Sequence, residues 1–331
     1  MSTERLCALP ILVRRMQAGS DVLFPKIPIG SGSCRTRMPV HFARALATIL
    51  ALSILRAGPA QAQIPNPLDT TFNVSSSQTV PSSLTIGSSP GSVGELASPG
   101  TVSISENLTV GNSGTGTLNI TSGGTVSNEA GFSSIGEEEG SSGTVTVTGV
   151  NAQTGTHSTW TTNGTTNGGF PGLLFIGFSG TGELTIANGG IVRAERGVQL
   201  GGAFSGTGTL NIGAAPGSPS VAPGTLETPE VTLGAPLPGQ TPPPGGSGTG
   251  TLNFNHTATD YHFAPEIRGQ GDVNVLNGTT ILEANNTDYD GNTTIERGTL
   301  AVGVPEALGT GDVFLLGGRC VQQVWRKPAS P

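Results

Sequence analysis

The chain has 331 residues, with 15 Lys and Arg against 22 Asp and Glu, and a formal net charge of −7. Residues 1–62 contain 8 of the basic and 2 of the acidic residues, so the rest carries 7 basic and 20 acidic residues, a net charge of −13 (7 − 20). An acidic chain of this kind argues against nucleic acid or anionic lipid as a partner, because phosphate groups are bound through Lys and Arg.

The N-terminal segment, residues 1–62, is predicted to be a leader that ends in a secretory signal peptide. After Met38 come a basic residue, Arg44, and an apolar run over residues 45–55. This order is typical of the n-region and h-region of a signal peptide. The run is too short for a membrane-spanning helix.

The end of the signal is marked by Ala60 and Ala62, which form a small-residue cleavage site in front of Gln63. We therefore expect export through the Sec translocon and cleavage after Ala62. Residues 1–37 are either an extended leader or the result of a start codon assigned too early. The compact signal favours Met38 as the true start.

The Cys residues predict a fold without disulfides. Cys7 and Cys34 fall in the leader and Cys320 near the C-terminus, so residues 63–319 contain none. A small exported domain is usually held together by disulfides. A chain of this length can instead bury a core by stacking repeated coils.

The next segment, residues 63–100, is rich in Ser and Pro and only weakly patterned. We interpret it as a low-complexity linker. Short apolar alternation at residues 79–80 and 84–87 suggests a first, capping coil within it.

A repeated pattern organises the chain from residue 101 to residue 318. At residues 114–120 the sequence reads Gly-Thr-Gly-Thr-Leu-Asn-Ile. Alternation of this kind predicts a strand with Leu118 and Ile120 on the core face and Asn119 on the other. The best-defined copies share a glycine and two apolar residues: Gly116, Leu118 and Ile120; Gly182, Leu184 and Ile186; Gly208, Leu210 and Ile212. Related copies lie at 143–147, 248–254, 269–275 and 309–313.

The spacing of these copies predicts a solenoid. Measured from the last glycine before each strand, positions 116, 143, 182, 208, 250, 271 and 311 are separated by 27, 39, 26, 42, 21 and 40 residues. The longer steps indicate an inserted loop or an extra coil. A second apolar strand precedes most copies, as at Phe175-Ile176-Gly177. Periods of this size are typical of stacked coils that cover each other's hydrophobic faces.

Two segments interrupt the repeat. Residues 155–172 are predicted to be a loop or insertion, in which Trp160 is either a platform for stacking a sugar or a cap on a coil edge. Residues 214–247 are rich in Pro and are predicted to be a surface excursion, with a strand only at Glu230–Leu233. No apolar run of helical period follows residue 62, so the fold class is predicted to be all-β.

A longer motif occupies residues 282–303 and continues at residues 307–313. Its elements are Asn-Thr-x-Tyr-x-Gly ending at Gly291, Thr-Thr-Ile at 293–295, Gly298-Thr-Leu300, and a closing Leu-Gly-Thr-Gly-Asp-Val that ends at residue 313. This segment resembles the autotransporter-associated β-strand repeat of Gram-negative autotransporter passenger domains. The resemblance, extended over residues 101–316, implies a right-handed parallel β-helix of the pectin-lyase-like class on the outer face of the cell, delivered by a C-terminal outer-membrane barrel.

The last residues depart from that family. The expected barrel would need many strands of alternating polarity, and these 331 residues contain none of it. Residues 319–331 contain three of the seven basic residues that follow the leader, a Trp and a Cys, and no acidic residue. We interpret them as an aberrant tail from a truncated or frameshifted gene. The alternative is a genuine short tail.

Residues with catalytic chemistry are sparse. His256 and His262 flank Asp260 and Tyr261, a cluster that is either a metal or acid–base site or an ordinary loop. Glu137–Glu139 is either a cation site or a solvated turn. The Asp residues at 272 and 312 follow glycines as in calcium-binding repeats, but lie too far apart to share an ion. We therefore expect no catalytic residues, metal site or cofactor.

These observations predict an exported autotransporter passenger fragment with a structural or adhesive role and no enzymatic activity. Its expected partner is a host or neighbouring-cell surface or a glycan. Its expected location is the cell surface or the extracellular space if a barrel is supplied, and otherwise the periplasm. The alternative is a β-helix enzyme that acts on extracellular polysaccharide, since this fold class hosts such enzymes.

Overall fold

The computed structural model describes residues 62–164, 172–202, 205–234 and 248–322. The chain divides into two units, Met1–Gln61 and Ala62–Pro331, and every described residue belongs to the second. The predicted leader up to residue 61, including Met38 and Ala60, therefore lies outside the described residues. Ala62 and Gln63 are the first described residues, and both are exposed.

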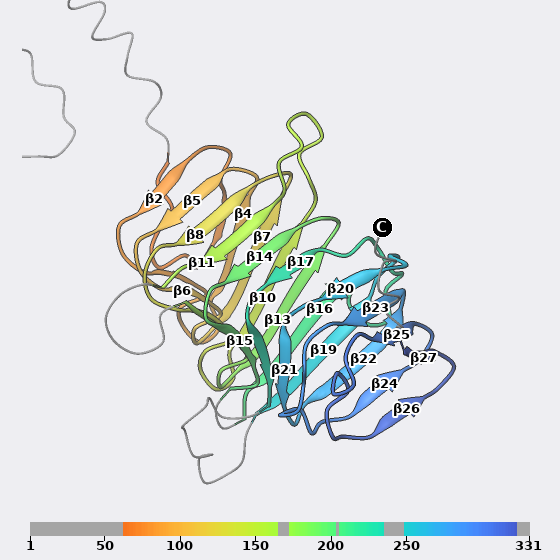
Figure 1. The fold of residues 1–331 in the computed structure, drawn as a ribbon. Coiled ribbons are helices and arrows are strands. Elements are labelled where there is room, and N and C mark those ends of the chain that lie inside the picture. The colour runs from red at the N-terminus through yellow and green to blue at the C-terminus, as the bar shows by residue number, and fades with distance from the viewer. Residues whose placement is uncertain (1–61, 165–171, 203–204, 235–247, 323–331) are drawn as a thin grey trace, which may run out of the picture. The chain divides into compact units, whose positions relative to one another are not determined.

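The described residues form strands and no helix, and the strands within each sheet are parallel neighbours (Figure 1). Sheet 1 has ten strands: β1 (Thr71–Asn73), β4 (Val93–Ser98), β7 (Thr115–Thr121), β10 (Ser142–Thr148), β13 (Thr181–Ala187), β16 (Thr207–Gly213), β19 (Thr249–Asn255), β22 (Asp272–Asn277), β24 (Thr293–Ile295) and β26 (Val313–Leu315). Sheet 2 has six: β2 (Gln78–Val80), β5 (Thr101–Ile104), β8 (Thr125–Asn128), β11 (Thr159–Thr162), β14 (Ile191–Ala194) and β17 (Thr225–Glu227).

The other two sheets complete the coils. Sheet 3 has seven strands: β3 (Leu84–Ile86), β6 (Leu108–Val110), β9 (Ser133–Ile135), β12 (Leu173–Ile176), β15 (Gly197–Leu200), β18 (Glu230–Leu233) and β21 (Glu266–Gly269). Sheet 4 has four: β20 (Tyr261–Phe263), β23 (Thr279–Leu282), β25 (Thr299–Val302) and β27 (Arg319–Gln322).

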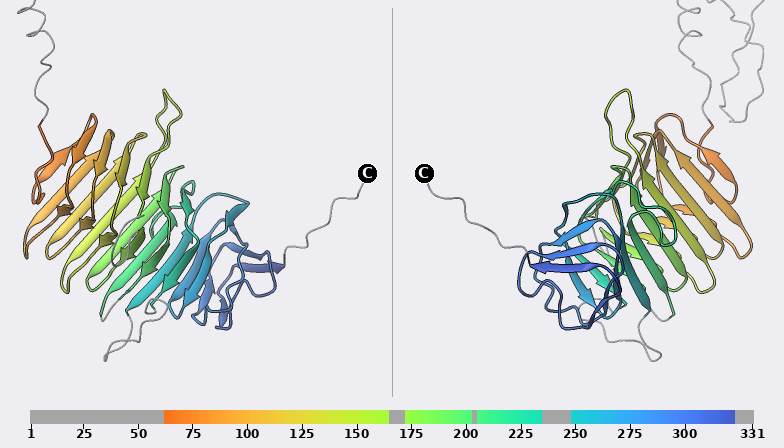
Figure 2. Two further views of the ribbon diagram at one scale, coloured as in Figure 1. Left: turned by 60° about the vertical axis from the view of Figure 1, so that its left-hand side comes forward. Right: turned by 90° about the vertical axis from the view of Figure 1, so that its right-hand side faces the viewer.

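Each of the first six coils contributes one strand to sheet 1, then sheet 2, then sheet 3, as the stacked rows of Figure 2 show. In the seventh coil sheet 4 takes the second position, and the last three coils have strands only in sheets 1 and 4. An isolated parallel bridge between Gly269 and Tyr289 continues the third side for one more turn. The predicted parallel β-helix is thus confirmed.

The alternating sequence pattern fixes the register of sheet 1. Leu184 pairs with Val145 in the preceding coil and Leu210 in the following one, and all three side chains are buried in the core. The repeat-defining apolar residues Leu118, Ile120, Leu184, Ile186, Leu210, Ile212 and Leu300 are all fully buried. The solenoid core is therefore a set of aliphatic columns, each coil covering the next.

Apart from Gly298, the repeat-defining glycines lie at one corner of the coils, between sheets 3 and 1. A Cβ at Gly182 would lie 2.3 Å from the nitrogen of Gly177 and 2.4 Å from the carbonyl oxygen of Ile135. A Cβ at Gly116, Gly208 or Gly291 would meet backbone atoms of the preceding coil in the same way. Gly298 lies at the corner between sheets 1 and 4, where a Cβ would meet the Val275 side chain. The corner between sheets 3 and 1 has no room for a side chain, because successive coils approach too closely there.

Register also explains the irregular spacing of the repeats. Val273 pairs with Thr293, and Thr293 pairs with Val313, so the step of 40 residues is two coils of 20 (293 − 273 and 313 − 293). The step of 39 contains a hairpin closed by an antiparallel bridge between Val150 and His157. The step of 42 spans the Pro-rich segment 214–247, of which residues 235–247 lie outside the described residues.

The structure extends the solenoid beyond the predicted limits at its N-terminal end. Residues 63–100, predicted as a linker with one capping coil, form β1 to β4, so the linker prediction is corrected. The buried side chains Leu68, Leu84, Ile86 and Leu96 supply the core of this part. They were hard to recognise because Ser and Pro separate them. The Pro-rich excursion likewise contains β17 in addition to the predicted strand β18.

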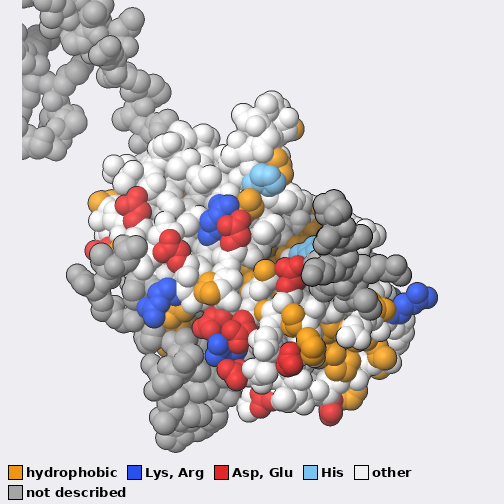
Figure 3. Space-filling view, in the orientation of Figure 1, with side chains coloured by type: hydrophobic (Ala, Val, Ile, Leu, Met, Phe, Trp, Pro, Cys, Tyr) orange, Lys and Arg blue, Asp and Glu red, His pale blue; other side chains and the backbone are white. Residues whose placement is uncertain are grey.

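At the C-terminal end, β27 starts at Arg319 and pairs in parallel with β25, so residues 319–322 continue the coil instead of starting a tail. The last coil is exposed, with Phe314, Leu315 and Leu316 among the exposed large hydrophobic side chains. Hydrophobic side chains gather over the C-terminal coils in Figure 3. Residues 323–331 lie outside the described residues. In the described part, no helix is long and apolar enough to cross a membrane.

Trp160 differs from both of its predicted roles. It lies in β11, in register with Val126 and Val192, and its side chain is fully buried in the solenoid core. The indole is therefore neither a platform open to a sugar nor a cap on an edge.

Candidate ligand-binding hollow on sheet 3

The outer faces of the sheets differ in what they offer to solvent. On sheet 1 the Asn side chains form a row of hydrogen bonds from coil to coil. Asn253 donates to Asn211 at 2.9 Å, and Asn274 donates to Asn253 at 3.0 Å. On sheet 2, Arg193 forms a bidentate pair with Glu227, at 2.7 and 3.1 Å. These polar groups are already satisfied by one another. The outer face of sheet 3 is different, because two cavities open on it.

The outward positions of sheet 3 form one row across the coils. In register order it reads Thr109, Ser134, Phe175, Gln199, Thr232 and Arg268. Outward positions of an exposed sheet are ordinarily polar, so Phe175 departs from the pattern. The residue is nevertheless only 3% exposed.

Phe175 is the centre of a row of three rings outside the core. Its centroid lies 5.8 Å from that of Phe132 and 5.2 Å from that of Phe178, and both pairs are edge-to-face. Phe132 and Phe178 are half-buried. The solenoid core is already filled with aliphatic side chains, so these three phenyl rings are not needed to build it. An apolar cluster on the outer face is typical of an interaction site.

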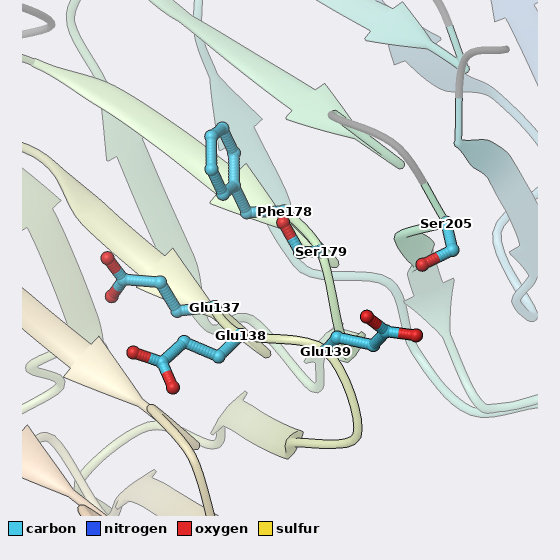
Figure 4. Close-up of a pocket in the computed structure, with 6 residues that line it drawn as sticks. All are labelled: Glu137, Glu138, Glu139, Phe178, Ser179 and Ser205. Carbon is cyan, nitrogen blue, oxygen red and sulfur yellow. The ribbon is translucent and has the colours of Figure 1, made fainter. Parts of the chain in front are cut away.

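Two adjoining cavities open beside these rings. An apolar one of about 170 Å³ is lined by Phe132, Ser134, Glu137, Phe175 and Phe178. A more open, acidic one of about 320 Å³ is lined by Glu137, Glu138, Glu139, Phe178, Ser179 and Ser205 (Figure 4). Because Glu137 and Phe178 line both, we describe the two cavities together as the sheet 3 hollow.

The three carboxylates of the hollow come from the turn that follows β9. Glu137 and Glu138 point to the same side, and Glu139 points away from them (Figure 4). Thr109 donates to Glu137 at 2.9 Å and Ser113 donates to Glu138 at 2.5 Å. Burial raises the pKa of Glu137, the Thr109 hydroxyl lowers it in part, and repulsion from Glu138 raises it further. The site thus holds a carboxylate in an environment that disfavours its charge.

Ser134 supplies an unused polar group in the apolar part of the hollow. The residue is 1% exposed, and within the described structure its Oγ has no hydrogen-bond partner. A buried hydroxyl without a partner costs about 1–3 kcal/mol. Such a group is expected where a ligand supplies the missing bond.

The predicted His cluster is divided by the structure. His256 is buried after β19, contacts the Tyr261 ring in a tilted arrangement with centroids 5.1 Å apart, and has its Nε2 2.9 Å from the Thr280 hydroxyl. His262 is exposed, and its Nδ1 lies 2.5 Å from Glu283. Asp260 is exposed. The two imidazoles therefore serve different local contacts and do not face a common site.

His256 is expected to make the solenoid sensitive to acid. Burial lowers its pKa from 6.5 to about 4, against a backbone hydrogen bond to Ala258 that raises it. At a pH between these two pKa values, the imidazole binds a proton in the unfolded chain but not in the folded chain. The folded state therefore loses stability as the pH falls through this range. We expect the free energy of unfolding to drop by about 1–2 kcal/mol from about pH 7.5 to about pH 5.

The measurement is urea denaturation at both pH values for His256→Gln and for His157→Gln, in which an exposed imidazole of the hairpin is removed. His256→Gln should flatten the pH dependence and His157→Gln should leave it. If both variants keep the same dependence as the parent chain, His256 is not its source.

The Asp residues of the later coils, among them the two at 272 and 312 that were considered for calcium, have different surroundings. Asp288 accepts from Arg268 at 3.0 Å, and Asp290 accepts from Gln270 at 3.1 Å. Asp272 and Asp312 are exposed in different coils. In the ranges that the structure describes, no group of three or more His, Cys, Asp or Glu is placed to hold a metal ion.

Sequence reasoning missed the sheet 3 hollow because its residues come from separate coils. Glu137–Glu139 was noticed as an acidic run, and Phe175 as part of an apolar strand. The available signal was a Phe at a strand position where the neighbouring coils have Ser134 and Gln199. Recognising it requires the register between coils.

No family model and no solved structure matches the chain. Among curated proteins it is similar to YdeK, an uncharacterized lipoprotein of Escherichia coli K12, with 35% identity over 136 residues. The match covers 39% of this chain and 9% of the lipoprotein. The chain thus spans less than a tenth of the curated relative that it matches.

Proposed function

We propose that this chain is an exported β-helical passenger module that acts in the cell envelope or at the cell surface by binding, with a structural or adhesive role and no catalysis. The observation that carries the binding role is the sheet 3 hollow, where aromatic rings and carboxylates interrupt an otherwise polar outer face. The similarity to a lipoprotein supports an envelope location. The resemblance to autotransporter repeats supports delivery through the Sec translocon and an outer-membrane barrel.

The absence of catalysis is proposed from the placement of the acidic groups. Glycoside hydrolysis needs two carboxyl groups facing one bond at a set separation, one of them protonated. In the hollow, Glu137 and Glu138 belong to one turn and point the same way (Figure 4). Release of reducing ends or unsaturated products from acidic polysaccharides by the purified chain would contradict this proposal and favour the enzymatic alternative.

Export is tested by expressing the full chain with a C-terminal epitope in a Gram-negative host. We expect the product in the envelope fractions, with Gln63 as its first residue by N-terminal sequencing. The matched variant carries Ala60→Arg and Ala62→Arg, which place bulky charged side chains at the two small positions of the cleavage site. This variant should remain unprocessed. A parent chain that stays in the cytoplasm with its leader intact would refute export.

A further inference from the structure

We propose that the sheet 3 hollow binds a small organic compound through a primary or secondary ammonium group. The carboxylate of Glu137 would hold the charge, the phenyl rings would contact the adjoining carbon chain, and the Ser134 hydroxyl would accept an N–H. This inference names the ligand class of the proposed binding role and rests on that role.

The first argument is unbalanced charge. None of the ion pairs found in the described residues includes Glu137, Glu138 or Glu139. Elsewhere on the same sheet Arg268 is paired with Glu230, Glu266 and Asp288. The chain therefore neutralises one acidic cluster with its own guanidinium and leaves the other open to an external cation. A cation next to Glu137 would also offset the burial of its carboxylate.

The second argument is the apolar wall. A hydrated inorganic ion gains nothing from phenyl rings, whereas an organic ammonium buries its carbon chain and its charge is attracted to a ring face. Phe132, Phe175 and Phe178 supply this wall next to Glu137. Glu139 points away from the other two carboxylates (Figure 4), so the three do not converge on one ion.

The third argument is the unused hydroxyl of Ser134. It lines the apolar part of the hollow together with Glu137, and its Oγ has no partner within the described structure. An N–H of a primary or secondary ammonium held by Glu137 would satisfy it. A quaternary ammonium has no N–H, and a neutral alcohol has no charge, so neither satisfies both groups.

The test measures binding of n-butylammonium chloride to the full-length chain by ligand-observed NMR, with 1-butanol as the neutral compound of the same size and tetramethylammonium as the cation without N–H. A dissociation constant on the order of 1 mM is expected for a fragment of this size. Binding of 1-butanol should be at least about 10-fold weaker. Tetramethylammonium should bind with an affinity between the two.

Two variants in the hollow and one control variant outside it test whether the hollow is the binding site. Glu137→Gln keeps the shape of the side chain and removes its charge, and should weaken n-butylammonium at least about 10-fold. Ser134→Ala should weaken it by roughly 5-fold without changing tetramethylammonium. Glu306→Gln removes an exposed charge in the later coils and should change nothing. Circular dichroism of each variant establishes that it is folded.

The proposal is overturned if n-butylammonium does not bind, if 1-butanol binds equally, or if Glu137→Gln and Glu306→Gln behave alike. Displacement of n-butylammonium by millimolar calcium through the same residues would also overturn it, since the hollow would then be a metal site. These results leave the export experiment untouched. A chain that is exported and processed but binds no amine would lose only this inference.

Discussion

Gly182→Ala is expected to destabilise the solenoid by more than about 3 kcal/mol. The added Cβ would fall 2.3 Å from the nitrogen of Gly177 and 2.4 Å from the oxygen of Ile135. Those two atoms form a coil-to-coil hydrogen bond of 2.7 Å. The methyl group would therefore separate two coils at a backbone contact, where no flexible side chain can move aside.

The matched control is Gly140→Ala, which differs in the kind of constraint. Gly140 has a φ of +80°, and a Cβ there meets nothing within 4 Å. Gly140→Ala is therefore expected to lower the free energy of unfolding only through the strain of a left-handed backbone conformation, by about 1 kcal/mol. The measurement is chemical denaturation followed by far-ultraviolet circular dichroism. Equal losses for the two variants would show that close approach at the corner is not what requires Gly182.

Leu210→Asp is expected to cost at least about 4 kcal/mol, because a carboxylate would replace a fully buried aliphatic group at 0% exposure. Leu184 and Leu252, its partners in the two adjacent coils, would lose their shared contact surface. We expect the variant either to remain unfolded or to be cleaved near this coil by a protease at low concentration.

Thr209→Asn is the control for that substitution. Thr209 is adjacent in the same strand but half-buried on the outer face, in register with Glu183 and Thr251. An amide is accommodated on this face at the next outward position, Asn211. We expect a change within about 0.5 kcal/mol. A larger loss at Thr209 than at Leu210 would reverse the assignment of inner and outer faces.

The parallel β-helix could be predicted from the sequence because the seven residues 114–120 recur unchanged at residues 206–212. Alternation decides which side chains face the core, and the glycine at the start of a sheet 1 strand marks where a coil begins. Where either signal weakens, the prediction was incomplete. The first coils lack the glycine–threonine pattern, and the residues of β24 were predicted only as the Thr-Thr-Ile element of the longer motif, not as a copy of the strand pattern. The partners of β24, Val273 and Val313, were found on either side.

Residues that need contacts between coils could not be placed from the sequence. Trp160 was assigned to a loop because Thr, Asn and Gly surround it, yet its column with Val126 and Val192 places it in the core. The residues of the sheet 3 hollow were likewise predicted as two unrelated features, an acidic turn and an apolar strand. Local composition describes solvent exposure on average, whereas the register between coils decides which side chain meets which.

The arrangement of the strands has a mechanical consequence. Within each sheet of the described residues, a strand bonds to its counterparts in the adjacent coils, and the last coils repeat every 20 residues (293 − 273 and 313 − 293). A force that pulls on the C-terminus would act first on the hydrogen bonds of the coil at that end. The coils would then separate one after another. Each detached coil of that length would lengthen the chain by about 70 Å, the contour of 20 extended residues. The exposed final coil would yield first, so the molecule would lengthen in steps, with the remaining coils still closed.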